Sequence, residues 1–200
     1  MNSSFPVLRT FLIAAAAVML ATPAAGQASA VPAGSRFTKA DVEFMQGMIA
    51  HHAQAIVMSA LVPSRTQSQP IRMLAKRIEV SQTDEIKLMQ QWLADRHQEV
   101  PDPKAHSMHH DSMLMPGMLT QAQLDQLSAA RGPEFDRLFL EDMTRHHEGA
   151  LTMVAKLFAT PGAGQEAATF SFASDVEADQ RAEIGRMRAL LDQSNEGHRP

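Results

Sequence analysis

The sequence predicts an all-α protein, a four-helix bundle made of two repeated helical hairpins that are joined by a Met/His-rich connector. Three observations lead to this prediction. Apolar residues recur at helical spacing in four long segments, and no segment keeps the alternation of a β-strand. The two halves of the chain repeat one another. A chain of 200 residues that is 44% hydrophobic and 20% charged has the size and composition of one domain with a buried core.

The N-terminal segment 1–30 is expected to be a signal peptide. It has a polar start that contains Arg9, an apolar run over 11–21, and small residues at its end. The apolar run is shorter than the roughly 20 residues that a membrane-spanning helix needs. We therefore expect a periplasmic or secreted protein whose mature chain opens with a flexible segment, 31–37. An uncleaved membrane anchor is the alternative.

Two helices are expected in the first half of the mature chain. Thr38 is a suitable N-cap, with Asp41 three residues later, for a helix that runs to about Leu61. The segment "VPSRTQSQP" interrupts this helix. Pro70 then suits the first turn of a second helix that ends near His97.

The second half begins after a connector, 101–118, whose three prolines and one glycine exclude a continuous helix. Thr120 and Gln123 have the spacing of a capping box, which predicts a short helix to about Ala130. Two further long helices are expected over 133–159 and 165–193, separated by "TPGAG".

The long helices form an internal repeat within the bundle domain, 38–194. "DVEFMQGMIAHHAQAIVM" matches "DRLFLEDMTRHHEGALTM" at a constant offset of 95 residues. The partner segments "SQTDEIKLMQQWL" and "ADQRAEIGRMRALL" also correspond. Each half, 38–97 and 133–194, is therefore one helical hairpin, and two such hairpins should pack as a pseudo-symmetric bundle.

Each repeat carries two adjacent histidines on the apolar face of its first helix. With Met48 at the centre of a helical wheel, His52 falls about 40° to one side and His51 about 60° to the other. Burying adjacent imidazoles twice is costly because each ring nitrogen needs a partner, whereas bundles commonly build metal sites from facing side chains. The candidate metal ligands of the helices are Met48, His51, His52, Met58, Met143, His146, His147 and Met153.

Two alternatives concern the packing of these residues. In the first alternative, the histidines are hydrogen-bonded core residues and the methionines are ordinary gap-fillers. The second concerns the partner helices, where Gln82, Glu85, Gln180 and Glu183 either accept hydrogen bonds from the histidines or lie on a solvated helix edge.

The connector supplies a second set of candidate ligands. The chain has no Cys, 14 Met and 9 His, so thiolate sites are excluded and soft or borderline ligands abound. Thioethers favour Cu(I) and imidazoles accept copper or zinc, whereas Ca²⁺ and Mg²⁺ prefer oxygen. A disordered, oxidation-prone linker is the alternative. The candidate metal ligands of the connector are His106, Met108, His109, His110, Met113, Met115 and Met118.

These motifs resemble the CopM-like family of ferritin-like, Met/His-rich periplasmic copper-binding proteins, long catalogued as a domain of unknown function. The resemblance rests on "FMQGMIAHHAQAIVM", "SQTDEIKLMQQWL", "MPGM" and "FDRLFLEDMTRHHEGALTM" and covers most of the chain from Thr38 to Leu191. It implies a ferritin-like four-helix bundle that binds copper in the cell envelope and helps to tolerate or deliver it. The residues that carry over are Met48, His51, His52, Met143, His146 and His147, and less directly the connector.

The sequence thus predicts a non-catalytic protein that buffers, sequesters or delivers copper, with Cu(I) as the expected ion and Cu(II) or Ag(I) as alternatives. A copper-transfer protein and a second copy of the chain are the expected protein partners. The net charge of −4 and the lack of a basic block argue against nucleic acid, and no membrane contact is expected after leader cleavage. A ferritin-like di-metal oxidase or catalase is the enzymatic alternative, but no histidine follows a glutamate at the Glu-x-x-His spacing. A structural module with packed histidines is the third hypothesis.

Overall fold

The structure, a computed structural model, describes residues 37–103 and 114–196, and within them every regular element is a helix. The fold class predicted from the sequence is confirmed. The predicted leader, 1–30, lies outside the described residues. Within them, no helix is long and apolar enough to cross a membrane. The helices are α1 (Lys39–Arg65), α2 (Gln69–Asp95), α3 (Gln121–Ala129), α4 (Gly132–Ala159) and α5 (Ala167–Glu196).

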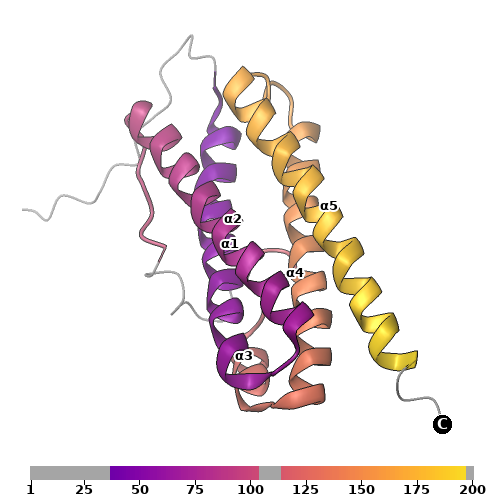
Figure 1. Cartoon of the computed structure of the whole chain (residues 1–200). Coiled ribbons are helices and arrows are strands. Elements are labelled where there is room, and N and C mark those ends of the chain that lie inside the picture. Colours follow the sequence, from indigo (N-terminus) through magenta and orange to yellow (C-terminus); the bar gives the residue numbers. More distant parts are fainter. Residues whose placement is uncertain (1–36, 104–113, 197–200) are drawn as a thin grey trace, which may run out of the picture.

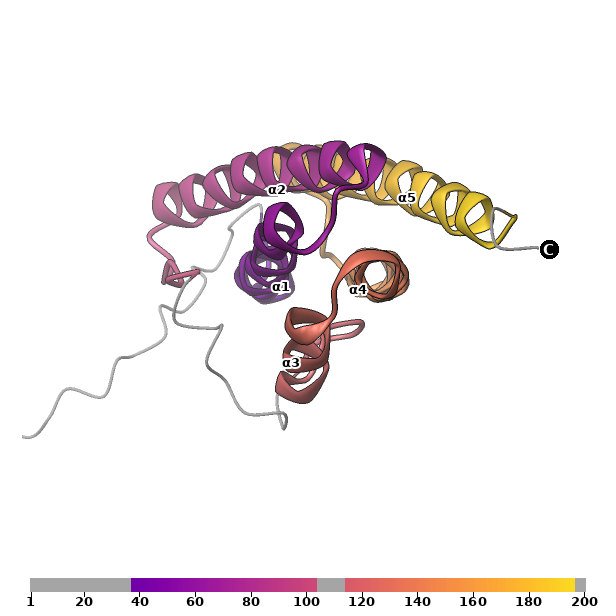
Figure 2. The ribbon, with the colours of Figure 1, turned by 60° about the horizontal axis from the view of Figure 1, so that its bottom comes forward.

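The four long helices form two hairpins that pack in two layers. α1 contacts α2 and α4 contacts α5 along their lengths, while α1 and α4 contact each other. Figure 1 shows the two hairpins side by side, and Figure 2 shows α2 and α5 in one layer with α1 and α4 in the other. The short helix α3 packs on α1 and α4 at the face opposite α2 and α5. The first helix of each repeat therefore lies at the centre of the molecule.

Local signals in the sequence set the helix starts. The Thr38 hydroxyl accepts a hydrogen bond from the Asp41 N–H at 3.3 Å, and the Asp41 carboxylate accepts one from the Thr38 N–H at 2.6 Å. The other Asp41 oxygen accepts from the Gly164 N–H at 2.7 Å, which ties the start of α1 to the loop between α4 and α5. Thr120 and Gln123 form the second predicted capping box. Both capping boxes are confirmed.

Two helix ends differ from the prediction. α1 continues past Leu61 and contains Pro63 in its last turn. A proline near a helix end removes only one hydrogen bond, and the turn is closed by the Thr66 N–H, which donates to the Val62 carbonyl at 3.2 Å. α2 ends before His97, whose φ of 54° is left-handed and stops the helix. The Gln98 N–H returns to the Leu93 carbonyl at 2.9 Å.

The core consists of two apolar clusters at different heights along the bundle. One contains Met58 of α1 and Met143 of α4, with Phe135 and Phe139. The other contains Met48, together with the C-terminal half of α4. The two histidine pairs fall between these clusters in sequence on both α1 and α4. The bundle therefore has a polar layer at mid-height, enclosed by apolar residues on both sides.

Candidate metal centre

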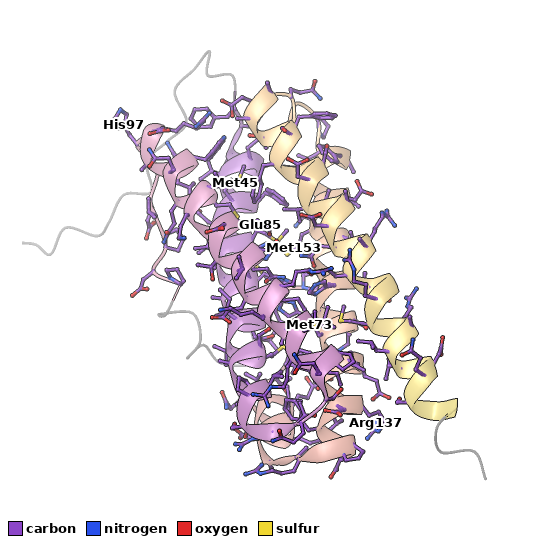
Figure 3. All side chains as sticks on the ribbon, in the orientation of Figure 1. Met45, Met73, Glu85, His97, Arg137 and Met153 are labelled. Atoms are coloured by element: carbon purple, nitrogen blue, oxygen red, sulfur yellow. The ribbon has the colours of Figure 1, made fainter. Side chains whose placement is uncertain are left out.

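The polar layer brings together all four histidines predicted from the repeat. His51, His52, His146 and His147 are fully buried, as are Met48 and Met143 one turn earlier on the same helices. The His51 and His146 rings lie against each other with centroids 3.8 Å apart and an angle of 38° between their planes. Because the rings come from equivalent positions of the two repeats, this contact lies on the pseudo-symmetry axis. Figure 3 shows Glu85 of α2 and Met153 of α4 near mid-height of the bundle.

The second histidine of each pair donates to a glutamate on the partner helix of its own hairpin. The His52 Nε2–H donates to Glu85 Oε2 at 2.5 Å, and the His147 Nε2–H donates to Glu183 Oε2 at 2.7 Å. Ser81 also donates to the Glu85 carboxylate, at 3.2 Å. Both glutamates therefore act as the predicted acceptors, and each fixes the orientation of one imidazole.

The two glutamines of the partner helices are also part of the layer. Gln82 and Gln180 are 1% and 2% exposed, and Glu183 is 4% exposed. The solvated-edge alternative is therefore wrong for these three residues. Both amide atoms of Gln82 and the carbonyl oxygen of Gln180 have no hydrogen-bond partner among the described residues. The glutamines thus leave unused polar atoms in the layer, and the predicted bonds to histidine are made by Glu85 and Glu183 alone.

His51 has a different partner from its equivalent in the second repeat. Its Nε2–H donates to the Pro116 carbonyl at 2.9 Å, so the connector supplies this acceptor. His146 has no hydrogen-bond partner at either ring nitrogen among the described residues. The connector occurs once in the chain, and its described part hydrogen-bonds to His51 and not to His146. The layer is therefore pseudo-symmetric in its rings and asymmetric in its hydrogen bonds.

The environment keeps the two central rings neutral. Burial lowers the pKa of His51 to about 3, assisted by the neighbouring His52 and opposed by the Pro116 carbonyl. Burial also lowers the pKa of His146 well below its usual value, and the nearby His51, His147 and His52 add to this effect. A neutral imidazole carries a lone pair on one nitrogen, which is the form that binds a metal.

The unused nitrogens are the atoms that such a metal would contact. The Nδ1 atoms of His51, His52 and His147, and both nitrogens of His146, are buried without a hydrogen-bond partner in the described part of the chain. Leaving a buried polar atom unpaired costs about 1–3 kcal/mol. This set of nitrogens, flanked by the thioethers of Met48 and Met143, fits a soft or borderline ion.

The histidines and carboxylates of the layer do not by themselves complete a metal site in the described part of the chain. In the residues that the structure describes, no three His, Asp or Glu side chains are grouped as they would be around a metal ion. An ion at this layer therefore needs thioether ligands or a small movement of the rings. Glu85 and Glu183 already accept from histidine, which leaves them better placed to orient ligands than to bind the ion.

The remaining predicted ligands lie on either side of the layer or outside the described residues. Met58 is fully buried in the cluster with Phe135 and Phe139, and Met153 is half-buried against the other cluster. Met115 and Met118, in the described end of the connector, are half-buried. Outside the described residues lie His106, Met108, His109, His110 and Met113.

Sequence reasoning missed the residues that attach the connector to the bundle. The Gln54 amide donates to the Leu119 carbonyl at 2.9 Å and accepts from the Leu119 N–H at 2.7 Å. A Cβ at Gly149 would lie 1.9 Å from the Pro116 carbonyl oxygen, so only glycine admits the turn at this point. Gln54 and Gly149 occupy equivalent positions of the two repeats. Their difference, next to matched histidines, is the signal in the sequence that marks this attachment.

An acidic groove lies between α2 and α5, on the opposite side of the layer from the connector. It has a volume of about 310 Å³ and is lined by Glu85, Asp175 and Asp179 among others. Burial and the nearby Glu85, Glu183 and Asp175 raise the pKa of Asp179. A groove lined by carboxylates attracts cations to the outer side of the His52–Glu85 pair.

Comparisons with known proteins agree with this fold. The chain matches the family model described as "Domain of unknown function (DUF305)" over residues 41–195. A crystal structure of a DUF305 fragment from Deinococcus radiodurans is 29% identical, with a TM-score of 0.69, and the match covers 78% of this chain and 98% of that one. A predicted secreted DUF305 protein from Streptomyces coelicolor is 28% identical, with a TM-score of 0.68 and coverage of 78% and 94%.

A third similar structure is CopM in its Cu(II)-bound form. It is 28% identical, with a TM-score of 0.63, and the match covers 76% of this chain and 96% of CopM. CopM is also known in Cu(I)-bound and silver-bound forms.

A curated relative, uncharacterized protein L153 of Acanthamoeba polyphaga mimivirus, is 41% identical over 56 residues, and the match spans 28% of this chain and 37% of that protein. Because the family model covers most of its length, the chain belongs to the DUF305 family of helical proteins, whose similar solved structures include copper-bound CopM.

Proposed function

We propose that this protein binds copper in the cell envelope and buffers, sequesters or delivers it without catalysing a reaction. The observation that carries the proposal is the buried layer of four histidines, each with at least one ring nitrogen that has no partner among the described residues. Buried polar atoms nearly always have a partner, so a set of unpaired acceptor nitrogens at the centre of the core points to a bound ligand. Copper-bound CopM, which is similar in fold and sequence, supports the choice of metal.

The ligand set favours Cu(I) over harder ions. Thioethers bind Cu(I) well and the neutral imidazoles accept it, so an ion shared among Met48, Met143 and the histidines needs no change in oxidation state. We expect the ion to bind and leave by exchange between such ligands. The His/Met-rich connector would capture copper from outside, and the fixed imidazoles would hold it. The expected signal peptide, 1–30, supports a periplasmic or secreted location.

The test is a Cu(I) titration of the metal-free protein against a competing chelator, with paired histidine variants. His51→Leu combined with His146→Leu removes the two rings that lie on the axis and should lower the number of tightly bound ions. His97→Leu is the matched control, because His97 is exposed at the far end of α2 (Figure 3). Unchanged stoichiometry and affinity in the double variant would refute the histidine layer as a copper site.

A second comparison separates the bundle from the connector. Replacing 104–113 with a Gly/Ser segment of equal length removes five of the predicted connector ligands and leaves the anchored turn in place. Copper retained by this variant supports a site in the bundle, and complete loss places the site in the connector.

The oxidase hypothesis predicts turnover of oxygen or peroxide by the iron-loaded protein, and the packing hypothesis predicts that copper leaves the melting temperature unchanged.

A further inference from the structure

The histidine layer has no opening to solvent through its own residues. All four histidines and both adjacent methionines are fully buried. An ion that reaches His51 therefore has to pass side chains that lie between the layer and the surface. On the side of the bundle that faces the connector, the described turn 115–118 covers this route.

Hydrogen bonds and a close contact between two glycines fix the turn 115–118 on the bundle. Gln54 binds both backbone groups of Leu119, and the Pro116 carbonyl accepts from His51. The Met118 N–H closes the turn by donating to the Met115 carbonyl at 3.1 Å. Gly117 has a φ of 78°, a left-handed conformation that favours glycine, and its Cα lies against Gly149. Met115 is thus fixed at the edge of the bundle, one residue from the group that binds His51.

The side chains of two methionines from separate segments lie next to Gly47. A Cβ at Gly47 would lie 3.1 Å from the Met115 sulfur and 3.4 Å from the terminal methyl of Met153, and among the described residues no other heavy atom outside its own helix segment lies within 4 Å. Met115 comes from the connector and Met153 from α4. Gly47 precedes His51 by one helical turn, so both residues share one face of α1.

This arrangement occurs in only one half of the repeat. Asp142 occupies the position equivalent to Gly47, and Met58, which is equivalent to Met153, is fully buried in the apolar core. Met153 and Met115 are half-buried and keep a route to solvent. A pair of thioethers from separate segments, placed over a glycine and beside a histidine ligand, has the composition of a soft-metal site.

We infer that Met115 and Met153 form a thioether site for a monovalent soft cation, Cu(I) or Ag(I), through which the ion passes to His51. This inference rests on the proposed function and adds to it a loading site that connector and bundle share. Two neutral sulfur ligands bind Cu(I) in preference to Cu(II) or Zn²⁺. A site with few ligands binds more weakly than one with many, which suits a position from which the ion moves on.

The test follows the methionine methyl groups by NMR during a titration with Ag(I), a diamagnetic probe. The protein carries ¹³C-labelled methionine methyls, and single variants Met115→Leu and Met153→Leu assign the two resonances. These substitutions conserve volume and normally preserve a packed core. We expect both resonances to shift once Ag(I) is added beyond the amount that the histidine layer holds, while Met73, which is 62% exposed on α2, does not. Ag(I) that binds and leaves both resonances unchanged overturns the inference.

Loading kinetics give a second measurement. Met115→Leu with Met153→Leu should slow Cu(I) uptake by the histidine layer at least tenfold and leave the number of layer-bound ions unchanged, with Met73→Leu as control. An unchanged rate refutes the loading site while leaving the proposed function intact. Unchanged copper stoichiometry in the His51→Leu/His146→Leu variant, together with normal methionine shifts, would refute the histidine layer and leave the thioether site intact.

Gly47→Ala separates a metal role from a structural one. Alanine favours a helix over glycine by about 1 kcal/mol, so this substitution should not lower the melting temperature. Its added methyl group lies within 3.1–3.4 Å of the two methionine side chains and must displace them. We expect weaker binding, by several-fold, of the Ag(I) ion that shifts the two methionine resonances, in a protein that is at least as stable. Unchanged affinity in this variant, with displaced methyl resonances, contradicts the site.

Discussion

The His51 and His146 rings lie against each other, tilted by 38°, with centroids 3.8 Å apart, and both are completely buried. They come from equivalent positions of the two repeats, so the contact joins the two hairpins at their centre. Burial holds the pKa of His51 at about 3 and that of His146 well below its usual value. The folded protein therefore contains two imidazoles that stay neutral at pH values where an exposed histidine is charged.

The first prediction concerns the pH dependence of stability in the metal-free protein. In the unfolded chain both histidines bind a proton as the pH falls through about 6.5. The folded chain does not bind these protons until the pH approaches the lowered pKa values, about 3 for His51. The unfolded state thus binds more protons in this window, and the free energy of unfolding should fall with pH by about 1.4 kcal/mol per pH unit for each histidine.

Urea denaturation at pH 7, 6, 5 and 4, compared between the wild type and His146→Leu, measures this effect. Among the described residues His146 has no hydrogen-bond partner, so an apolar replacement leaves none of their polar groups newly unpaired. The variant should be of similar or greater stability at pH 7 and should lose less stability on acidification. Carboxylates with raised pKa values, such as Asp136, titrate alike in both proteins and cancel in the difference. Parallel pH profiles would show that His146 is not held neutral.

The second prediction concerns the carboxylates that orient His52 and His147. In Glu85→Gln and Glu183→Gln the amide oxygen still accepts from the imidazole N–H, but the negative charge is lost. Because such a partner raises the basicity of a ligating histidine, its loss typically weakens metal binding by about 10–100-fold. Glu79→Gln is the matched control, since Glu79 lies on α2 with a 44% exposed side chain that contacts Lys76. Cu(I) affinities measured by chelator competition should separate the two glutamates from this control.

Much of this site could be predicted from the sequence because the repeat constrains it twice. Helical spacing placed His51 and His52 on the apolar face, and the second copy made a chance placement implausible. The partner helices carried glutamates at matching positions, and both accept from a histidine in the structure. Capping residues such as Thr38 and Thr120 gave helix starts through local hydrogen bonds, which need no knowledge of the tertiary fold.

The attachment of the connector depends on tertiary contacts and was not predicted. A glycine inside a helix, such as Gly149, indicates only a local weakness until the Pro116 carbonyl is placed against it. Gln54 is a polar residue near an apolar helix face, and its partner Leu119 lies 65 residues away. The ring contact between His51 and His146 likewise depends on how the two hairpins dock, which spacing within one helix does not define.

The third prediction compares two helical glycines with opposite surroundings. A Cβ at Gly149 meets the Pro116 carbonyl oxygen at 1.9 Å and the Gly117 Cα at 2.8 Å, and both atoms belong to the backbone. At Gly185 of α5 a Cβ meets no atom of the described residues within 4 Å. Gly149→Ala should therefore destabilise by roughly 1–3 kcal/mol through forced movement of the turn, whereas Gly185→Ala should stabilise by up to about 1 kcal/mol through helix propensity. Thermal denaturation of both variants tests the contrast, and equal effects would show that the turn does not pack on α4.

The last prediction concerns the two hydrogen bonds that Gln54 makes to Leu119. Leu119 is 1% exposed, so Gln54→Ala leaves a backbone N–H and a carbonyl without their partners in a buried position. Each unpaired group costs about 1–3 kcal/mol, and the variant should be destabilised by about 2 kcal/mol or more. Gln46→Ala is the control on the same helix, because Gln46 makes one exposed bond, to the Glu99 carbonyl at 2.9 Å, whose loss should change stability by less than about 0.5 kcal/mol. Release of the turn also removes the Pro116 carbonyl from His51, so hydrogen exchange at the Met118 and Leu119 amides should accelerate in Gln54→Ala and not in Gln46→Ala. If the two variants exchange alike, the connector is held by other contacts.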